Sequence, residues 1–289
     1  MTSAINGRTR VFGIFGWPVE HTFSPMMHNS AFDSLGLDCV YVPFPVNPDD
    51  LGKAVEGIRS LGISGVNVTI PHKSTVIKYL DEVSPEAKLI GAVNTITNKG
   101  GFLTGYNTDA MGFVKSLKLD GGTDPAGKRV MILGAGGAAR AVTIQLALSG
   151  IKELTIVSPV AEEIASLSEV ITGSLNIPVK GLIWDEQVIS NCLEETDILI
   201  HATPLGMHPD TDKMPPVEVG LLPGHALVCD LIYNPGETLL LRKAAERGLK
   251  TQNGIGMLLY QGAIAFELWT GQEPPVEIMR DALKRALAK

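Results

Sequence analysis

The stretch LGAGGAARAV constrains the fold of this 289-residue chain more than any other, because it joins a strand to a helix through a glycine-rich turn. Residues 130–133 form a continuous apolar run that predicts a buried strand, and the residues after the turn predict a helix that ends at Gly150. Gly134 permits the tight turn, Gly136 lets the backbone approach a pyrophosphate, and Ala139 lets the helix pack closely on the sheet. The helix N-terminus offers free N–H groups to phosphates. The turn predicts a dinucleotide site, and a tight turn without a ligand is the alternative.

Short strands alternate with helices on both sides of this turn. Before it, the strand patterns RVFGIFG, CVYVPFPV, GVNVTI and AVNTIT are separated by helical patterns over 25–35, 49–61 and 84–90. After it, strands are predicted in LTIV, PVKGLIW, DILIHAT and ALVCDLI, with helices from about Glu162, over 238–247 and from Gly256. The turn-rich stretch DGGTDPAGK marks an edge between domains. This alternation predicts an α/β fold with mainly parallel sheets.

Composition and charge exclude several classes of partner. The net charge is -7, from 31 acidic and 24 basic residues, so neither nucleic acid nor an anionic membrane is a favoured partner. The three cysteines lack C-x-x-C spacing, which argues against zinc and disulfides and suits a reducing cytoplasm. His21, His28 and His72 lack the spacing of metal ligands, so no metal is expected. Because no segment matches a signal peptide or a membrane span, we expect a cytoplasmic protein.

A lysine stands where one strand of the first half ends. In GVNVTIPHK, apolar residues alternate with Asn67 and Thr69 until Pro71 interrupts the pattern, and Lys73 follows. Ligands of open α/β sheets bind outside the carboxyl ends of the strands. A lysine there can take the proton of a substrate hydroxyl as a hydride leaves. The alternative is a solvated loop lysine.

Three further residues are candidates for the same site. Asp109, in the segment GYNTDAMG, would orient the lysine and keep it charged, or would serve only as a helix N-cap. Thr22 and Ser24 lie two positions apart in an extended stretch, so their hydroxyls project to the same side and can hold a carboxylate. Helix capping alone is again the alternative, with Ser24 as the cap and Pro25 in the first turn.

The strand LTIV should end at the residue that distinguishes the two dinucleotides. An acid there would accept a hydrogen bond from the ribose 2′-OH of NAD, and an arginine would bind the 2′-phosphate of NADP. The strand instead continues into Ser158, Pro159 and Val160, which supply neither group. Ser158 can donate a hydrogen bond to either ligand.

The motifs together resemble those of the shikimate dehydrogenase family. HTFSP, NVTIPHK, IGAVNT, GYNTDAMG, LGAGGAAR, HATPLGM, CDLIYNP and NGIGMLLYQGAIAFELW occur in the order and spacing of that family, over essentially the whole chain. The resemblance implies a substrate domain over 1–112, completed by C-terminal helices over 255–289, and a Rossmann NAD(P)-binding domain over 113–254.

The resemblance also implies roles for individual residues. Lys73 and Asp109 match the catalytic pair of the family. The substrate-binding positions are Thr22, Ser24, Thr69, Asn94, Tyr233 and Gln261, with Thr22 in place of the usual serine. The dinucleotide-binding positions are Gly134, Ala135, Gly136, Gly137, Ala138, Ala139, Ser158, Thr203, Met207, Gly254 and Met257.

Two positions depart from the family pattern. The family usually carries Asn-Arg-Ser/Thr after the second Rossmann strand, whereas this chain has SPV in a loop shortened by about three residues. Ala110 replaces the glycine of the usual NTDG. The first departure leaves the dinucleotide open between NADP, the usual one, and NAD.

The function implied by the resemblance is the reversible NAD(P)H-dependent reduction of 3-dehydroshikimate to shikimate, in aromatic amino-acid biosynthesis. One rival is an NAD-dependent quinate/shikimate dehydrogenase, and a rival of another class is a catalytically idle NAD(P)-binding regulatory protein. The presence of Lys73, Asp109 and Asn94 argues against an idle protein, since a sensor has no need of them. The oligomeric state, a homodimer included, is left open.

Overall fold

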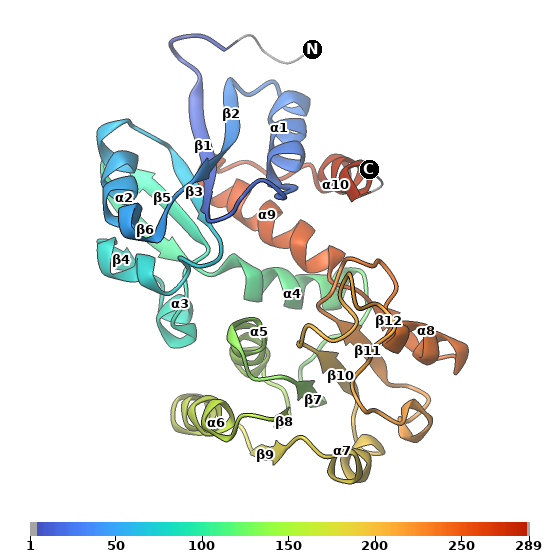
Figure 1. The fold of residues 1–289 in the computed structure, drawn as a ribbon. Coiled ribbons are helices and arrows are strands. Elements are labelled where there is room, and N and C mark those ends of the chain that lie inside the picture. Colours follow the sequence, from blue (N-terminus) through green and yellow to red (C-terminus); the bar gives the residue numbers. More distant parts are fainter. Residues whose placement is uncertain (1–4, 288–289) are drawn as a thin grey trace. The chain divides into compact units, whose positions relative to one another are not determined.

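Two separate β-sheets organise residues 5–287, which are the residues that this computed structural model describes (Figure 1). One compact unit comprises Met1–Gly112 and Leu259–Lys289, and the other comprises Phe113–Leu258. The chain passes between the units inside helix α4 (Thr108–Leu119) and again inside α9 (Ile255–Thr270). The second domain boundary predicted from the sequence lies at residue 254, and that domain assignment stays a prediction.

The first unit contains a mixed sheet with the strand order β2-β1-β3-β5-β6-β4. Strands β1, β2 and β3 are mutually parallel, and β5 pairs antiparallel with both β3 and β6. Its helical segments, besides parts of α4 and α9, are α1 (Ser24–Ser34), η1 (Pro48–Asp50), α2 (Leu51–Ser60), η2 (Thr75–Tyr79), α3 (Pro85–Ile90) and α10 (Val276–Leu287). Its strands are β1 (Arg10–Gly16), β2 (Cys39–Pro45), β3 (Gly65–Val68), β4 (Glu82–Val83), β5 (Thr95–Lys99) and β6 (Phe102–Tyr106).

The hairpin β5–β6 is the main feature of this sheet that the sequence analysis does not predict. The expected strand AVNTIT begins three residues before β5, and β6 is absent from the prediction. Gly100 and Gly101 both have positive φ, 64° and 92°, and Lys99 pairs with Phe102 across them. A Gly-Gly pair between two β-rich runs is a hairpin signal because both turn residues need positive φ. The hairpin explains why this sheet is mixed and not wholly parallel.

The second unit contains an entirely parallel sheet with the order β12-β11-β10-β7-β8-β9. This order is typical of a doubly wound sheet whose first strand carries a glycine-rich turn. The predicted strands and helices of this half are present, and α7 and β12 are additional. The elements are β7 (Arg129–Leu133), α5 (Gly137–Leu148), β8 (Glu153–Ser158), α6 (Ala161–Leu175), β9 (Val179–Ile183), α7 (Glu186–Leu193), β10 (Ile198–His201), η3 (Val219–Leu221), β11 (Leu227–Asp230), α8 (Leu239–Glu246) and β12 (Lys250–Gln252).

Apolar side chains fill the space between each sheet and its helices. In the first unit, Phe12, Phe32, Tyr41, Phe266 and Trp269 are buried, and the Trp269 indole N–H donates to the carbonyl of Ile96 at 3.0 Å. In the second unit, strand residues of β7, β10 and β11 are buried on both faces, as parallel strands covered by helices require. Among residues 5–287 we find no helix with the length and apolar character needed to span a membrane.

We expect the substitution Gly112→Ala to destabilise the first unit. A Cβ atom on Gly112 of α4 would lie 2.5 Å from the backbone N and 2.9 Å from the Cα of Gln261 in α9, which is too close for non-bonded atoms. A backbone cannot move aside as a side chain can. Overpacking of this kind costs about 1–3 kcal/mol. Thermal and urea unfolding of Gly112→Ala should show the loss.

Gly57→Ala in α2 is the matched control, because only the Leu61 side chain lies near its added Cβ, at 4.0 Å. An alanine there should leave stability unchanged or raise it by up to about 1 kcal/mol. A Gly112→Ala protein as stable as the parent would show that α4 and α9 do not pack as closely as described.

Candidate active site

The structure brings Lys73 and Asp109 together. Lys73 lies in the turn that follows β3, and its Nζ donates a hydrogen bond of 2.7 Å to Oδ2 of Asp109 in the first turn of α4. The two side chains are 34% and 18% exposed, so the pair is half-buried and remains reachable from solvent. An ammonium and a carboxylate in this contact form an oriented pair at the edge of a sheet, where ligands of α/β folds bind.

The turn that carries Lys73 is held on both sides. The Lys73 carbonyl accepts a hydrogen bond from Val93 N at 2.8 Å, and His72 N donates to the Thr69 carbonyl at 2.9 Å. The buried His72 ring places Nε2 at 2.8 Å from the Val46 carbonyl. His72 is therefore structural, and it fixes the start of the lysine side chain.

Asp109 is not the cap of α4. The side chain of Asn107 does the capping, since its Oδ1 accepts from Ala110 N at 3.1 Å while its Nδ2 donates to the Ala92 carbonyl at 3.0 Å. The alternative of Asp109 as an ordinary N-cap is therefore wrong. Its carboxylate is left to pair with Lys73.

Asn94 ties this helix start to the sheet. Its Oδ1 accepts from Thr108 N at 2.7 Å, and its Nδ2 donates to Thr108 Oγ1 at 3.1 Å. Its backbone carbonyl accepts from Val68 N of β3 at 2.8 Å. Asn94 thus lies between the strand that leads to Lys73 and the helix that carries Asp109, and it sets the position of both.

Asn67 is a polar residue of this region that the sequence analysis does not assign. Buried on β3, it donates through Nδ2 to the Asn94 carbonyl at 3.2 Å and to Thr95 Oγ1 at 3.0 Å. Its Oδ1 accepts from the Tyr41 hydroxyl at 2.7 Å. The signal for it was present in the sequence, because an asparagine inside an apolar strand needs partners when it is buried.

The network reaches the predicted carboxylate site through Tyr41. Burial raises the pKa of the Tyr41 hydroxyl far above its usual range, and a hydrogen bond with Ser24 acts in the opposite direction. Ser24 itself is buried, and it is the first residue of α1. The Ser24 hydroxyl is thereby connected to Asn67 by a chain of buried hydrogen bonds.

The expected capping role of Ser24 is wrong. Phe23 occupies the N-cap position of α1 without a side-chain cap, and the Thr22 hydroxyl accepts from Ser24 N at 3.3 Å. Pro25 lies in the first turn as predicted. Thr22 is half-buried and Ser24 is buried at the start of α1, and neither side chain caps the helix as its N-cap residue.

The remaining predicted substrate residues are distributed over both units. Thr69 follows β3 in the first unit and donates from its backbone N to the Phe15 carbonyl at 2.9 Å. Gln261 is buried on the part of α9 that belongs to the first unit. Tyr233 belongs to the second unit, where partial burial raises the pKa of its hydroxyl above the ordinary value. Their contact with a substrate stays a prediction.

His28 and His21 have different surroundings. His28 is fully buried and stacks on Tyr41 with ring centroids 4.5 Å apart, and burial lowers its pKa to about 3, so the ring stays neutral. His21 is exposed. Over residues 5–287, no group of three or more His, Cys, Asp or Glu side chains is placed to hold a metal ion.

The glycine-rich turn of the second unit has the shape that a dinucleotide needs. Gly134 has a φ of 110°, and a Cβ there would meet the Ala202 carbonyl. Gly136 and Gly137 face open space, and among the described residues no side chain caps the first turn of α5. Ala139 is buried against the sheet. The turn therefore leaves helix N–H groups open to a pyrophosphate, which fits an NAD(P) ligand.

Glu163 is the acid near the end of β8 that the sequence analysis misses. Ser158 is buried, with its hydroxyl donating toward Glu163 Oε2 at 3.5 Å and accepting from Val160 N at 3.2 Å. The hydroxyl hydrogen is thus directed toward Glu163, and contact between Ser158 and a ligand stays a prediction. Glu163 is exposed in the first turn of α6, five residues after Ser158. The strand end itself carries neither an acid nor an arginine, and Glu163 is the acid that the structure places beside it.

Two more segments with predicted dinucleotide residues follow β10 and β12. Thr203 begins the first loop, and its methyl group lies near the position of a Cβ on Gly134. Gly254 N donates to the Ile232 carbonyl after β11 at 3.0 Å, and a Cβ on Gly254 would collide with the Leu231 carbonyl. Met207 is exposed at the end of the first loop, and Met257 is half-buried on α9. Thr203 thus packs on the glycine-rich turn, and Gly254 packs on the backbone at the end of β11.

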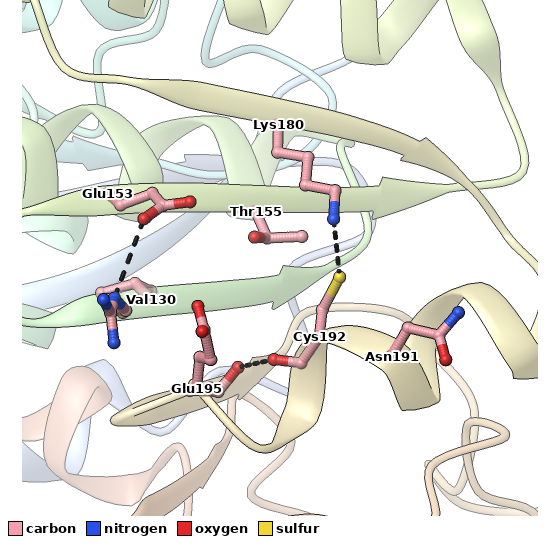
Figure 2. Close-up of a pocket in the computed structure, with 9 residues that line it drawn as sticks. Val130, Glu153, Thr155, Lys180, Asn191, Cys192 and Glu195 are labelled. Atoms are coloured by element: carbon pink, nitrogen blue, oxygen red, sulfur yellow. Dashed lines mark hydrogen bonds and ion pairs between the residues drawn. The ribbon is translucent and has the colours of Figure 1, made fainter.

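A small pocket at the opposite, amino-terminal edge of this sheet is a separate feature. Figure 2 shows Lys180 of β9 directing its Nζ toward Cys192 Sγ, and the two atoms are 3.1 Å apart. Arg129 and Glu153 also line the pocket, which holds about 70 Å³. Ligand pockets usually hold roughly 300–1,000 Å³. None of the predicted site residues lines it.

Two family models match the chain. The shikimate dehydrogenase substrate binding domain matches residues 14–96, and the shikimate 5'-dehydrogenase C-terminal domain matches residues 254–284. A shikimate dehydrogenase (NADP(+)) from Desulforamulus reducens is 50% identical over 285 residues, which cover 99% of this chain and 98% of the relative. The chain belongs to the shikimate dehydrogenase family.

Solved structures of the family share the fold of this shikimate dehydrogenase homologue. A crystal structure of a shikimate dehydrogenase in complex with NADP+ is 45% identical, with a TM-score of 0.91 over 100% of this chain and 99% of that one. Shikimate 5-dehydrogenase from Listeria monocytogenes, in complex with shikimate and NAD, is 39% identical, with a TM-score of 0.94 over 98% and 99% of the two chains. The predicted α/β fold class is confirmed.

In this member of the shikimate dehydrogenase family, replacing Thr22 or Ser24 with alanine should raise the KM for shikimate more than it lowers kcat. A carboxylate far from the reacting carbon is held equally in the ground and transition states, so its loss affects binding. A hydrogen bond to a charged group contributes about 1.5–3 kcal/mol, which predicts a KM increase of roughly 10- to 100-fold. Initial-rate measurements at saturating dinucleotide give both constants.

Ser34→Ala provides the control at the other end of α1, where the Ser34 hydroxyl donates to the Ala31 carbonyl at 2.9 Å. Its KM for shikimate should equal that of the parent. A Thr22→Ala/Ser24→Ala double variant with the parental KM would remove both hydroxyls from the substrate site.

Proposed function

We propose that this protein catalyses the reversible NADPH-dependent reduction of 3-dehydroshikimate to shikimate, a step of aromatic amino-acid biosynthesis. The observation that carries the proposal is the 2.7 Å pair between Lys73 Nζ and Asp109 Oδ2 beside a strand end. Family membership and the open glycine-rich turn support it. The substrate ring would lie against the first unit, with its reacting hydroxyl at Lys73.

Lys73 has the proton-transfer role. In the direction of shikimate oxidation, Lys73 first releases a proton to solvent and its neutral amine then takes the proton of the reacting hydroxyl; in the reverse direction the ammonium gives that proton to the forming hydroxyl. Asp109 accepts a hydrogen bond from Nζ, which fixes the direction of the lysine side chain. NADP, when bound, supplies the acceptor of the hydride that leaves the same carbon.

The other polar residues hold the substrate. Thr22 and Ser24 would donate to its carboxylate, while Asn94, Thr69 and Gln261 would surround its hydroxyls. Asn94 already directs its amide at Thr108, so it positions the helix of Asp109 as well as the ligand. A rigid, prepaired shell of this kind limits the reorganisation needed when the substrate arrives.

The dinucleotide would bind to the second unit. The N–H groups at the start of α5 would face the pyrophosphate. Thr203, in the loop after β10, and Gly254, after β12, would flank the nicotinamide. Glu163 would lie near the ribose 2′ position, because it projects beside the end of β8. A carboxylate there accepts a hydrogen bond from a 2′-OH and repels a 2′-phosphate.

Steady-state rates with shikimate and with quinate, each with NADP and with NAD, test the function and its rivals. We expect oxidation of shikimate, with a kcat/KM for NADP that exceeds that for NAD by about tenfold or less, since Glu163 opposes the 2′-phosphate that the family's usual dinucleotide carries.

Glu163→Gln should raise the ratio of kcat/KM for NADP to that for NAD by roughly three- to tenfold, because it removes the like charge.

Glu162→Gln is the matched control for charge, since Glu162 is exposed in the same helical turn. It should leave the ratio unchanged. Equal shifts in the two variants would assign the effect to the overall charge of the helix.

A higher kcat/KM for quinate with NAD than for shikimate with NADP would favour the NAD-dependent quinate/shikimate dehydrogenase. No turnover of either acid would favour the regulatory protein.

A further inference from the structure

A buried histidine–aspartate pair lies below the dinucleotide edge of the second sheet, and the proposed chemistry does not use it. His201 ends β10, Asp230 ends the neighbouring strand β11, and the two are paired in register. His201 Nδ1 lies 3.1 Å from Asp230 Oδ2, and both side chains are 0% exposed. Burying a carboxylate is costly unless it is hydrogen-bonded, so the partners of this pair should show what it stabilises.

Asp230 fastens the segment after β11. Its Oδ1 accepts from Ile232 N at 3.0 Å, and its Oδ2 accepts from the Thr238 hydroxyl at 2.7 Å. Thr238 in turn caps α8, accepting from Leu241 N at 3.4 Å. The Ile232 carbonyl accepts the hydrogen bond from Gly254 N. Asp230 therefore holds the backbone that leads into Tyr233 and against which Gly254 is fixed.

His201 fastens the segment after its own strand. Its Nε2 lies 2.5 Å from the Thr203 hydroxyl oxygen, and that oxygen also accepts from Leu205 N at 3.3 Å. In the tautomer that carries its hydrogen on Nδ1, the ring donates to Asp230 and Nε2 accepts from the Thr203 hydroxyl, so both nitrogens have a partner. The methyl group of Thr203 then lies over Gly134 of the glycine-rich turn.

We propose that His201 is a positioning residue whose Nε2 fixes Thr203 of the loop after β10, beside the nicotinamide, while Asp230 on the other ring nitrogen orients the ring. The inference rests on the proposed function, because that function makes NADP the ligand of this loop. The ring touches neither substrate nor dinucleotide. It acts by keeping Thr203 against the glycine-rich turn before the ligand arrives, which lowers the entropy lost on binding.

The two ring nitrogens can be tested separately, because amide side chains replace them one at a time. The Asn amide in His201→Asn reaches the place of Nδ1 and keeps the contact with Asp230, whereas the Gln amide in His201→Gln reaches the place of Nε2 and keeps the contact with Thr203. His201→Leu removes both. We expect the NADP dissociation constant of the ligand-free protein, measured by calorimetry, to rise at least tenfold in His201→Leu and His201→Asn and less than threefold in His201→Gln. The KM for shikimate should stay within twofold of the parent in all three.

Thr196→Val is the control for a loss of stability without loss of positioning. Thr196 is buried before the opposite end of β10, where its hydroxyl donates to the Cys192 carbonyl at 2.9 Å. This variant should melt at a lower temperature and bind NADP like the parent. If Thr196→Val weakens NADP binding as much as His201→Leu does, the role of His201 is only structural.

Amide hydrogen exchange supplies a readout that needs no ligand. In the protein without dinucleotide, residues 202–207 should exchange at least fivefold faster in His201→Leu and His201→Asn than in the parent, and at the parental rate in Thr196→Val. Parental exchange and parental NADP affinity in a folded His201→Asn would overturn the proposal. If His201→Leu does not fold, the comparison of His201→Asn with His201→Gln decides. A parent that fails to oxidise shikimate would refute the proposed function, while the exchange rates would still decide the positioning role.

Discussion

The contact between Lys73 and Asp109 is the interaction on which the arrangement of the first unit depends. It joins the turn after β3 to the first turn of α4 at 2.7 Å, and neither segment would hold its charged side chain in place alone. Buried polar groups behind the pair have partners: Asn94 bonds to Thr108, and Asn67 bonds to Thr95. Because an unpaired polar group in such a place costs about 1–3 kcal/mol, this network permits few alternative geometries. The Lys73–Asp109 pair therefore lies on a network of buried hydrogen bonds with few alternative geometries.

Much of this organisation can be predicted from the sequence. The parallel sheet of the second unit follows from apolar runs separated by helical patterns, and the glycine-rich turn identifies its first strand. The position of Lys73 after a strand is visible in the sequence, and Asp109 is a candidate partner there, while their roles as a catalytic pair come from the family resemblance. The segment NTD offers three side chains able to cap a helix, and only the structure shows that Asn107 does so and releases Asp109. The Gly100-Gly101 pair is itself a sequence signal for the β5–β6 hairpin, because both turn residues need positive φ.

Other features depend on which strands lie side by side and on where a helix begins, and neither can be read from the sequence pattern. Glu163 reaches the end of β8 only because α6 begins at Ala161, so its carboxylate returns beside Ser158. His201 is one residue of an apolar strand pattern until the register of β10 and β11 places it beside Asp230. Both cases need the pairing of strands or the exact start of a helix. Sequence periodicity predicts elements more reliably than such contacts.

A double-mutant cycle in kcat tests most directly whether Lys73 and Asp109 act as one unit. Lys73→Met and Asp109→Asn keep the side-chain size and remove the charges, and each should lower kcat by roughly 10²- to 10⁴-fold while leaving the NADP dissociation constant within about threefold of the parent. If the two residues share one step, the double variant should lose no more than about tenfold beyond the weaker of the two single variants. Losses that multiply in the double variant, or a Lys73→Met protein with near-parental kcat, would contradict the account.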